Sequence, residues 1–295
     1  MIDNTKKIDP TRTLTIQNRF YADIKRRMKK LKKKIDPEIE QFYLSSVTRQ
    51  NARRYEFLRS DEKHAEFMAW LNEQVSEGIL EMNAVTDRLN RRPWTDVYIY
   101  SAYKRGVDRA RAELKKAGYD VPPFATESIV GASFDRPVHA ERANLLFTRV
   151  FSDLKGITDA MSSQISRVLA DGMVRGISPL EMANELKEEI DKMTRTRAEM
   201  LARTEVVRAH HLANIAEYRE AGLDDLVVIA EFVATPDSRV CSICASLAGK
   251  RYSLDEAEGV IPVHPRCRCA MVPYLPEEDP RDPYQKPSDF TPADK

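Results

Sequence analysis

Apolar positions recur with a helical period through most of this chain. In residues 23–35 the side chains of Ile24, Met28, Leu31 and Ile35 are spaced four, three and four apart, which places them on one stripe of a helix. Residues 146–168 repeat this spacing over a longer stretch, and residues 37–116 keep a helical pattern with a break near residues 91–94. The pattern therefore predicts a protein that is mainly α-helical.

Short polar signals divide the helical pattern of the C-terminal half. Gly176 is expected to end the long helix, because glycine readily adopts the left-handed conformation of a C-terminal cap. Residues 178–181, Ser-Pro-Leu-Glu, have the composition of a capping box that begins the next helix. Residues 196–199 repeat the signature, so we expect another helix to begin there and run to residue 222.

Two short segments break the helical pattern near the C-terminus. Residues 226–233 are apolar and β-branched and predict a strand, and residues 270–274 predict a second one. The 10 glycines in 295 residues argue against a turn-rich barrel or sandwich and favour a mostly helical fold. The expected fold is mainly α with a small α+β C-terminal module, in which short strands surround a Cys/His site of the zinc-knuckle kind.

Changes in composition suggest four regions along the chain. We expect a helical N-terminal region at 1–118, a linker or extended arm without periodicity at 119–139, a second domain at 140–275 and a flexible tail at 276–295. The tail is rich in proline and acidic residues, a composition that does not support a packed core.

Charge is distributed unevenly, although the formal net charge is +1. Eight of the ten residues in 25–34 are Lys or Arg, and they surround the apolar stripe of the predicted helix at 23–35. This helix presents either a solvated face or a contact surface for an acidic partner, such as DNA phosphates or an acidic protein. The candidate contact residues are Lys25, Arg26, Arg27, Lys29, Lys30, Lys32, Lys33 and Lys34.

Two further features bear on the compartment. No stretch approaches the roughly eighteen apolar residues that cross a bilayer, so no membrane partner is expected. The start of the sequence has no apolar core of the signal-peptide type. We therefore expect the chain to be made in a reducing cytoplasm, where structural disulfides are uncommon.

All four cysteines lie in one segment with the spacing C-x2-C-x19-H-x2-C-x-C. Two ligands three positions apart fit a tight turn, and a later loop completes a tetrahedral zinc site. Five residues compete for four positions. Either Cys241, Cys244 and His264 bind with one of Cys267 or Cys269, or the four cysteines bind without His264. Zn²⁺ held in this way would be structural, because a closed coordination sphere leaves no position for an activated water.

Two other interpretations of the segment remain. Four cysteines can form two disulfides, and a treble-clef nuclease of the His-Asn-His type would use a histidine base beside separate metal ligands. The segment offers His264 for that base, which the metal also needs. His211 shares a helix face with apolar residues, so packing is its expected role.

The motifs of this region closely resemble those of the phage Mu F-like minor head protein family. The resemblance rests on Arg203-Thr-Glu205, on Thr235-Pro-Asp-Ser-Arg-Val-Cys-Ser-Ile-Cys244 with the following Leu-Ala-Gly-Lys, and on Pro262-Val-His-Pro-Arg-Cys-Arg-Cys269. It spans residues 188–273, which is under a third of the chain, and resembles a head morphogenesis domain of tailed bacteriophages.

The resemblance implies a structural, non-enzymatic minor capsid protein located in the virion, in the head interior near the portal vertex. Its implied partners are the portal protein, the inner surface of the major capsid protein and, as a further candidate, double-stranded DNA, with the host cytoplasm as its location during assembly. The zinc site of the family falls here on the five Cys and His residues. The alternative function is a metal-dependent treble-clef nuclease.

Several neighbours of the motif are expected to support the site. Asp237 is placed to accept hydrogen bonds from the turn at 239–241, and Gly249 to supply a positive φ after the first cysteine pair. Glu205, from the motif that begins at Arg203, is expected either to pair with Arg239 or Arg268 or to be exposed to solvent.

Overall fold

The structure is a computed structural model of the chain. It describes residues 10–46, 60–83, 93–116, 121, 137–220, 229–235 and 237–274. The expected tail at 276–295, most of the expected linker at 119–139 and the first residues of the expected strand at 226–233 lie outside the described residues.

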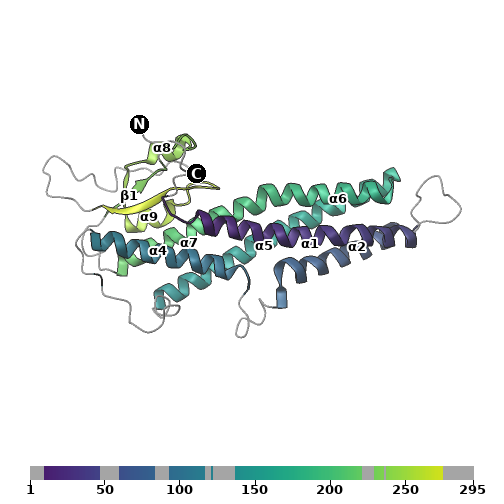
Figure 1. The fold of residues 1–295 in the computed structure, drawn as a ribbon, viewed down its shortest axis with the longest axis horizontal. Helices are drawn as coiled ribbons and strands as arrows, with labels where there is room; N and C mark the ends of the chain where they lie inside the picture. Colours follow the sequence, from purple (N-terminus) through teal and green to yellow (C-terminus); the bar gives the residue numbers. More distant parts are fainter. Residues whose placement is uncertain are drawn as a thin grey trace. The chain divides into compact units, whose positions relative to one another are not determined.

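The described chain is mostly helical and ends in a small antiparallel sheet, which confirms the expected fold class (Figure 1). Its helices and strands follow one another in this order: α1 (Leu14–Ser46), α2 (Ser60–Val75), the π-helical turn η1 (Ser76–Leu80), α4 (Asp96–Lys116), α5 (Pro137–Arg175), α6 (Pro179–Met193), the π-helical turn η2 (Thr194–Ala198), α7 (Glu199–Glu220), β1 (Ile229–Val233), α8 (Ser242–Leu247), β2 (Arg251–Ser253), α9 (Leu254–Val260) and β3 (Ala270–Tyr274).

The chain forms two compact units, each built from separated segments. The sheet unit comprises Met1–Asn18, Asp96–Thr148 and Ala202–Lys295, and the helical unit comprises Arg19–Thr95 and Arg149–Leu201. The division expected from composition, with boundaries near residues 118 and 140, stays a prediction.

The helical unit is assembled on the apolar stripe that the sequence pattern predicts in residues 23–35. Ile24, Met28, Leu31 and Ile35 are 0–4% exposed in α1. The stripe of α5 is also buried at Val150, Leu154, Met161 and Ile165, and it continues at Leu169. Because apolar side chains recur every three or four positions, they lie on one face of each long helix, and that face is buried.

Both expected signals between α5 and α6 are confirmed. Gly176 has a φ of +64°, and the amides of Gly176 and Ile177 donate to the carbonyls of Met173 and Gly172, the pattern of a Schellman cap. Ser178 is the N-cap of α6 and accepts a hydrogen bond from the Glu181 amide at 3.2 Å, with Pro179 in the first turn.

The helix start expected at residues 196–199 is wrong. Instead, η2 connects α6 to α7 without a break in the helix. The Thr196 hydroxyl donates to the Lys192 carbonyl at 2.8 Å, and the Thr194 hydroxyl donates to the Ile190 carbonyl at 2.7 Å. Because both hydroxyls bond backward within the helix, neither caps a new one.

The three strands pair antiparallel in the order β2–β1–β3. β3 coincides with the strand expected at 270–274, and β1 lies within the one expected at 226–233. β2 was not predicted, because three residues of mixed polarity carry no periodic signal. It is paired through β1, with Ala230 opposite Tyr252, so the sheet itself determines it.

The core of the sheet unit lies between the strands and helices α4 and α7, as Figure 1 shows. Phe232 and Met271 from the sheet and Val207 and Tyr218 from α7 are fully buried in it. Cys244, Cys267 and Cys269 belong to the same apolar cluster, at 1–3% exposure. Three of the four cysteines are thus part of the core, and Cys241 is partly buried beside them.

A buried chain of polar groups joins α4, α5 and α7 in the sheet unit. The Glu217 carboxylate accepts a hydrogen bond from Arg111 and lies 3.3 Å from His139 Nε2, and His139 Nδ1 lies 2.9 Å from the Tyr103 hydroxyl. These four side chains are 0–6% exposed. Burial opposes ionisation of Glu217, but the bonds from His139 and Arg111 lower its pKa. Because solvent does not reach the chain, its role is to fix three helices.

Helices α4 and α7 are in close contact at Gly106. A Cβ added at this position would lie 2.3 Å from the His210 carbonyl oxygen and 2.7 Å from Ala213 Cβ. Both are far inside van der Waals contact, so the close approach requires a residue without a side chain.

We therefore expect Gly106→Ala to lower the free energy of unfolding by about 1–3 kcal/mol, because α4 must move away from α7. Gly156→Ala is the matched control: Gly156 lies in α5 with no atom within 4 Å of the added Cβ. That control should be neutral or stabilising by about 0.5–1 kcal/mol. Urea unfolding of both variants measures the difference, and equal midpoints would contradict the close packing.

Candidate metal centre

The first cysteine pair is shaped by the short helix α8. Cys241 is the N-cap of α8, and its Sγ accepts a hydrogen bond from the Cys244 amide at 3.3 Å. The Cys241 carbonyl also accepts from the Ala245 amide. An amide directed at a cysteine sulfur stabilises the thiolate, and this bond is the main cause that lowers the pKa of Cys241.

The second loop is shaped by a tight turn after α9. The His264 carbonyl accepts from the Cys267 amide at 3.1 Å, and Arg266 has a φ of +64°. The Arg266 amide donates to the hydroxyl of Thr204 on α7 at 3.1 Å. Thr204 was not predicted as a site residue, although it is the middle residue of the Arg-Thr-Glu motif that carries the family resemblance.

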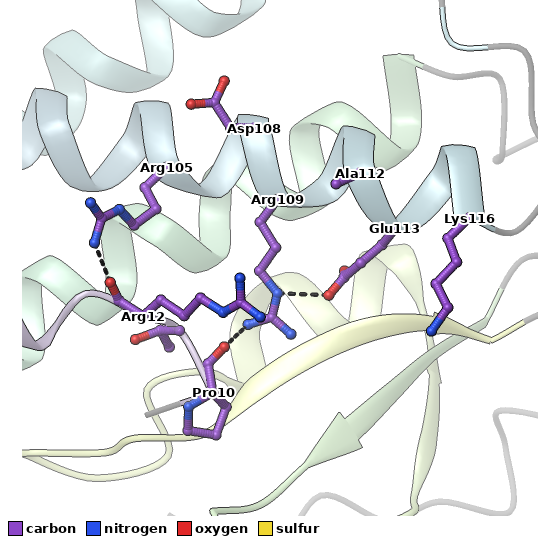
Figure 2. Close-up of a pocket in the computed structure, with 9 residues that line it drawn as sticks. Pro10, Arg12, Arg105, Asp108, Arg109, Ala112, Glu113 and Lys116 are labelled. Atoms are coloured by element: carbon purple, nitrogen blue, oxygen red, sulfur yellow. Dashed lines mark hydrogen bonds and ion pairs between the residues drawn. The ribbon is translucent and has the colours of Figure 1, made fainter. Parts of the chain in front are cut away.

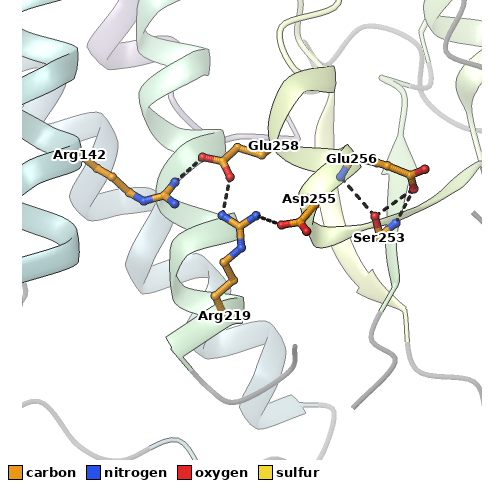
Figure 3. Close-up of polar contacts among 6 residues, drawn as sticks. All are labelled: Arg142, Arg219, Ser253, Asp255, Glu256 and Glu258. Carbon is orange, nitrogen blue, oxygen red and sulfur yellow. Dashed lines mark hydrogen bonds and ion pairs between the residues drawn. The ribbon is translucent and has the colours of Figure 1, made fainter. Parts of the chain in front are cut away.

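Helix α9 leads into this loop and is held by ion pairs (Figure 3). Glu258 binds both Arg142 of α5, at 2.6 Å, and Arg219 of α7, and Arg219 also binds Asp255 at 2.5 Å. At its start, Ser253 and Glu256 form a reciprocal capping box. The His264 loop is therefore anchored at its base.

The two loops bring all five candidate ligands together in two groups. His264 Nε2 lies 3.2 Å from Cys241 Sγ and 3.1 Å from Cys244 Sγ. Cys244 also belongs to a second group with Cys267 and Cys269, and within each group the ligand atoms are less than 4.8 Å apart. Ligand atoms around tetrahedral zinc are separated by about 3.5–3.8 Å, given bonds of about 2.0–2.3 Å. The arrangement fits one ion near Cys244, the member that both groups share.

The imidazole of His264 is oriented as a metal ligand. Its Nδ1 lies 2.8 Å from the Pro265 carbonyl and donates to it, so Nε2 keeps its lone pair toward the two sulfurs. Burial lowers the pKa of His264, whereas the Pro265 carbonyl and the neighbouring thiols raise it, and the net direction is upward. A backbone partner on the outer nitrogen is what ligating histidines usually have.

The three buried sulfurs do not ionise independently. Hydrogen bonds from Cys244 and Cys269 lower the pKa of Cys267, and the same contacts with Cys267 raise the pKa of Cys244 and Cys269. The contacts therefore favour ionisation of Cys267 over that of Cys244 and Cys269, and a cation among the sulfurs would favour the ionised form of each. The structure shows all four cysteines as free thiols, with no disulfide among them.

Asp237 binds the arginines of the motif. Its carboxylate accepts two hydrogen bonds from Arg268, at 2.7 and 2.8 Å, and one from the Arg239 side chain at 2.8 Å. The Arg239 amide donates to Asp237 Oδ1 at 3.0 Å, the contact expected of the turn. The bond from Arg268 is the main cause that holds the pKa of Asp237 below its usual range. Arg268 lies between Cys267 and Cys269, so this ion pair orients the second loop.

The remaining support residues lie on either side of the cluster. Gly249 has a φ of +77°, and its amide donates to the Phe232 carbonyl at the edge of the sheet. Glu205 is 2% exposed and accepts a hydrogen bond from Arg208 at 3.2 Å, so the solvent-exposed alternative is wrong. Its pairing with Arg239 or Arg268 stays a prediction, as does a supporting role for Arg203.

Two further histidines near the cluster are buried in α7. His211 Nε2 lies 2.8 Å from the Ala257 carbonyl, and burial lowers the pKa of His211 to about 4. His210 is 1% exposed, and burial holds its pKa well below the usual range. Both histidines are neutral and packed in the protein interior. For His211 this is the role expected from the apolar residues on its face of the helix.

In the basic segment of α1, some cations bind other residues and others face the solvent. Arg27 binds Gly78 and Glu81 and stacks 4.2 Å over the Trp94 ring. Other engaged cations are Arg26 with Asp23, Lys32 with Asp191 and Lys34 with Gln74. The lysines that are exposed and form no ion pair with any described residue, here named the α1 lysine face, are Lys25, Lys29, Lys30 and Lys33.

Residues 163–272 match the protein family described as Phage Mu protein F like protein. The matched segment covers just over a third of the chain and includes all five candidate ligands and the capped start of α6. It confirms the resemblance that the sequence motifs indicate. No curated protein and no solved structure matches the chain. Among the described helices, none combines the length and apolar character that crossing a bilayer requires.

The geometry predicts that Cys244→Ser abolishes zinc binding, because Cys244 belongs to both ligand groups. Cys267→Ser and Cys269→Ser should differ in how much zinc they still bind, and the difference identifies the fourth ligand. The control is Ala245→Ser, which adds the same hydroxyl at an exposed position of α8. Zinc content by elemental analysis and the thermal midpoint with and without a chelator are the measurements. A wild-type chain that is free of zinc when purified under reducing conditions would refute the metal site.

We expect Asp237→Asn to destabilise the chain by about 2 kcal/mol at neutral pH, because both arginines lose their charged acceptor. The contribution of a carboxylate with a lowered pKa is present above its unfolded pKa of about 3.9 and is lost as the pH falls through the folded value. The difference from wild type should therefore stay constant from about pH 8 to 5 and shrink below about pH 4.

Urea unfolding over this pH range measures the Asp237 effect. The control is Arg239→Gln, which removes the partner whose side chain is 54% exposed and should cost little. Equal losses for the two variants would show that the Asp237–Arg268 pair does not hold the loop.

Proposed function

We propose that this chain is a minor head protein of a tailed bacteriophage, a structural component of head morphogenesis. The observation that carries the proposal is the match of residues 163–272 to the phage Mu F-like family, which includes the complete Cys/His cluster. In this role the cluster holds the α8 turn and the His264 loop together, and it performs no reaction.

The burial of the cluster supports an architectural role over the nuclease alternative. Cys244, Cys267 and Cys269 are 1–3% exposed, which leaves little room for a substrate beside them. His264 has its Nδ1 on the Pro265 carbonyl and its Nε2 against two sulfurs, so neither nitrogen is available as a general base. Zn²⁺ at this position would be structural, with protein ligands completing its coordination.

The proposed location is the head interior near the portal vertex, with the host cytoplasm as the site of assembly. The proposed partners are the portal protein and the inner surface of the major capsid protein, with packaged double-stranded DNA as a further partner. These assignments extend the family match and need a surface that recognises an acidic partner.

The α1 lysine face supplies such a surface. Lys25, Lys29 and Lys33 are four residues apart and form one row along the helix, and Lys30 lies beside them. The apolar stripe on the opposite side is buried, so the helix is fixed and the lysines extend from a rigid support. Lysines on a rigid row attract phosphates or acidic side chains without reading base sequence.

Replacement of Lys25, Lys29, Lys30 and Lys33 by Gln tests this surface in the phage that encodes the chain. We expect fewer copies of the chain per purified particle, measured by quantitative mass spectrometry. If the partner is DNA, the affinity of the purified chain for duplex DNA should also fall roughly tenfold or more, with a smaller salt dependence.

The matched control replaces four exposed cations elsewhere, Lys115, Lys155, Arg167 and Arg197, by Gln. It removes the same charge and should leave incorporation unchanged. Absence of the wild-type chain from particles would overturn the proposed function, and metal-dependent cleavage of DNA that His264→Ala abolishes would favour the nuclease.

A further inference from the structure

A second cationic surface lies in the sheet unit and is separate from the α1 lysine face in sequence. Residues Pro10–Arg12 lie against α4 and form with it a pocket of about 880 Å³ (Figure 2). The charged residues that line the pocket are Arg12, Arg105, Arg109 and Lys116, with Asp108 and Glu113.

Two of these guanidinium groups are held by neutral acceptors. Arg105 donates to the Arg12 carbonyl and Arg109 donates to the Pro10 carbonyl, as Figure 2 shows. A carbonyl oxygen orients a guanidinium without cancelling its charge. The bonds therefore attach residues Pro10–Arg12 to α4. They leave the charge of Arg105 in place, whereas Arg109 also pairs with the Glu113 carboxylate.

Of the two acidic residues of the pocket, Asp108 pairs with a residue outside it and Glu113 pairs with Arg109. Asp108 pairs with Lys104 at 3.1 Å, and in Figure 2 its carboxylate points away from Arg12 and Arg109. Glu113 pairs with Arg109 at 2.6 Å and also accepts a hydrogen bond from the Tyr218 hydroxyl at 2.6 Å. Four cations against two carboxylates leave a formal charge of +2 among the lining residues.

Arg12 completes the cationic group. Its backbone has a φ of +55°, a left-handed conformation that costs a residue with a side chain about 1–3 kcal/mol. Its exposed side chain extends toward Arg109 in Figure 2, and it forms no ion pair with any described residue. Two guanidinium groups that point toward each other repel unless an anion lies between them.

We infer that this pocket binds phosphate groups, with Arg12, Arg105, Arg109 and Lys116 as the binding residues. Guanidinium forks match phosphate oxygens in pairs, and Lys116 adds a point charge at the end of the helix. The phosphate comes either from the backbone of duplex DNA or from a free polyphosphate. The site does not depend on the proposed function. The residues that line it belong to the sheet unit and lie outside the segment that matches the family.

The test uses the full chain with two probes, a short fluorescent DNA duplex and pyrophosphate. Arg12→Gln and Lys116→Gln are the main variants, because both side chains are exposed and their loss should not unfold the chain. Each should weaken binding of the recognised probe about fivefold to tenfold, and for DNA should reduce the salt slope by roughly one per phosphate contact. Arg12→Lys keeps the charge but loses the fork and should be intermediate.

Arg19→Gln and Lys115→Gln are the matched controls, since they remove the same charges at exposed positions that do not line the pocket. Loss with DNA alone assigns the site to the phosphodiester backbone, and loss with pyrophosphate assigns it to a free polyphosphate. The inference is overturned if the wild type binds neither probe, or if Arg12→Gln and Lys116→Gln behave like their controls. Repeating the DNA series with the α1 lysine face neutralised separates the two surfaces, because the pocket variants should retain their effect there.

Discussion

Sulfur atoms that meet in an apolar core cannot all carry a negative charge unless a cation lies among them. In this protein three cysteines with 1–3% exposure share that constraint, and His264 approaches one of them from the side. Without a cation the cluster is a set of small, weakly polar packing groups whose ionisation is coupled. With a divalent ion the same atoms become a cross-link between two loops.

The elements around the cluster limit how far its ligands can move. The His264 loop is held at three points: through α9 by the ion pairs of Arg142 and Arg219, through the Thr204 hydroxyl, and through Asp237 bound to Arg268. These contacts join the loop to α5, to α7 and to the segment that precedes α8. The ligands are thus held in position by their surroundings, and metal binding would add to an arrangement that the fold already favours.

Sequence patterns predicted what depends on local chemistry. Periodic apolar residues located the α1 stripe, Gly176 and Ser178 located a helix end and start, and cysteine spacing identified five candidate ligands that the structure brings together. Features that depend on distant partners were not predictable. β2 exists because β1 pairs with it, Gly106 is needed because α7 passes close by, and the Glu217 network needs residues from three helices. The helix start expected at residues 196–199 was wrong for a local reason. A threonine hydroxyl that can cap the start of a helix can also bond backward to a carbonyl within one, as it does in the continuous α6–η2–α7 helix.

The net charge of +1 conceals how the cations are used. Arg27, Lys32 and Lys34 stabilise the helical unit, although the sequence places them in the same run as the exposed lysines. In the sheet unit, Arg105 binds a backbone carbonyl, so it serves the fold and still presents its charge, whereas Arg109 binds both a carbonyl and the Glu113 carboxylate. A cation that pairs with a carboxylate is removed from the surface potential, whereas one that pairs with a carbonyl is not. The acceptor of each cation, more than the number of cations in a segment, therefore determines where this protein can attract an acidic partner.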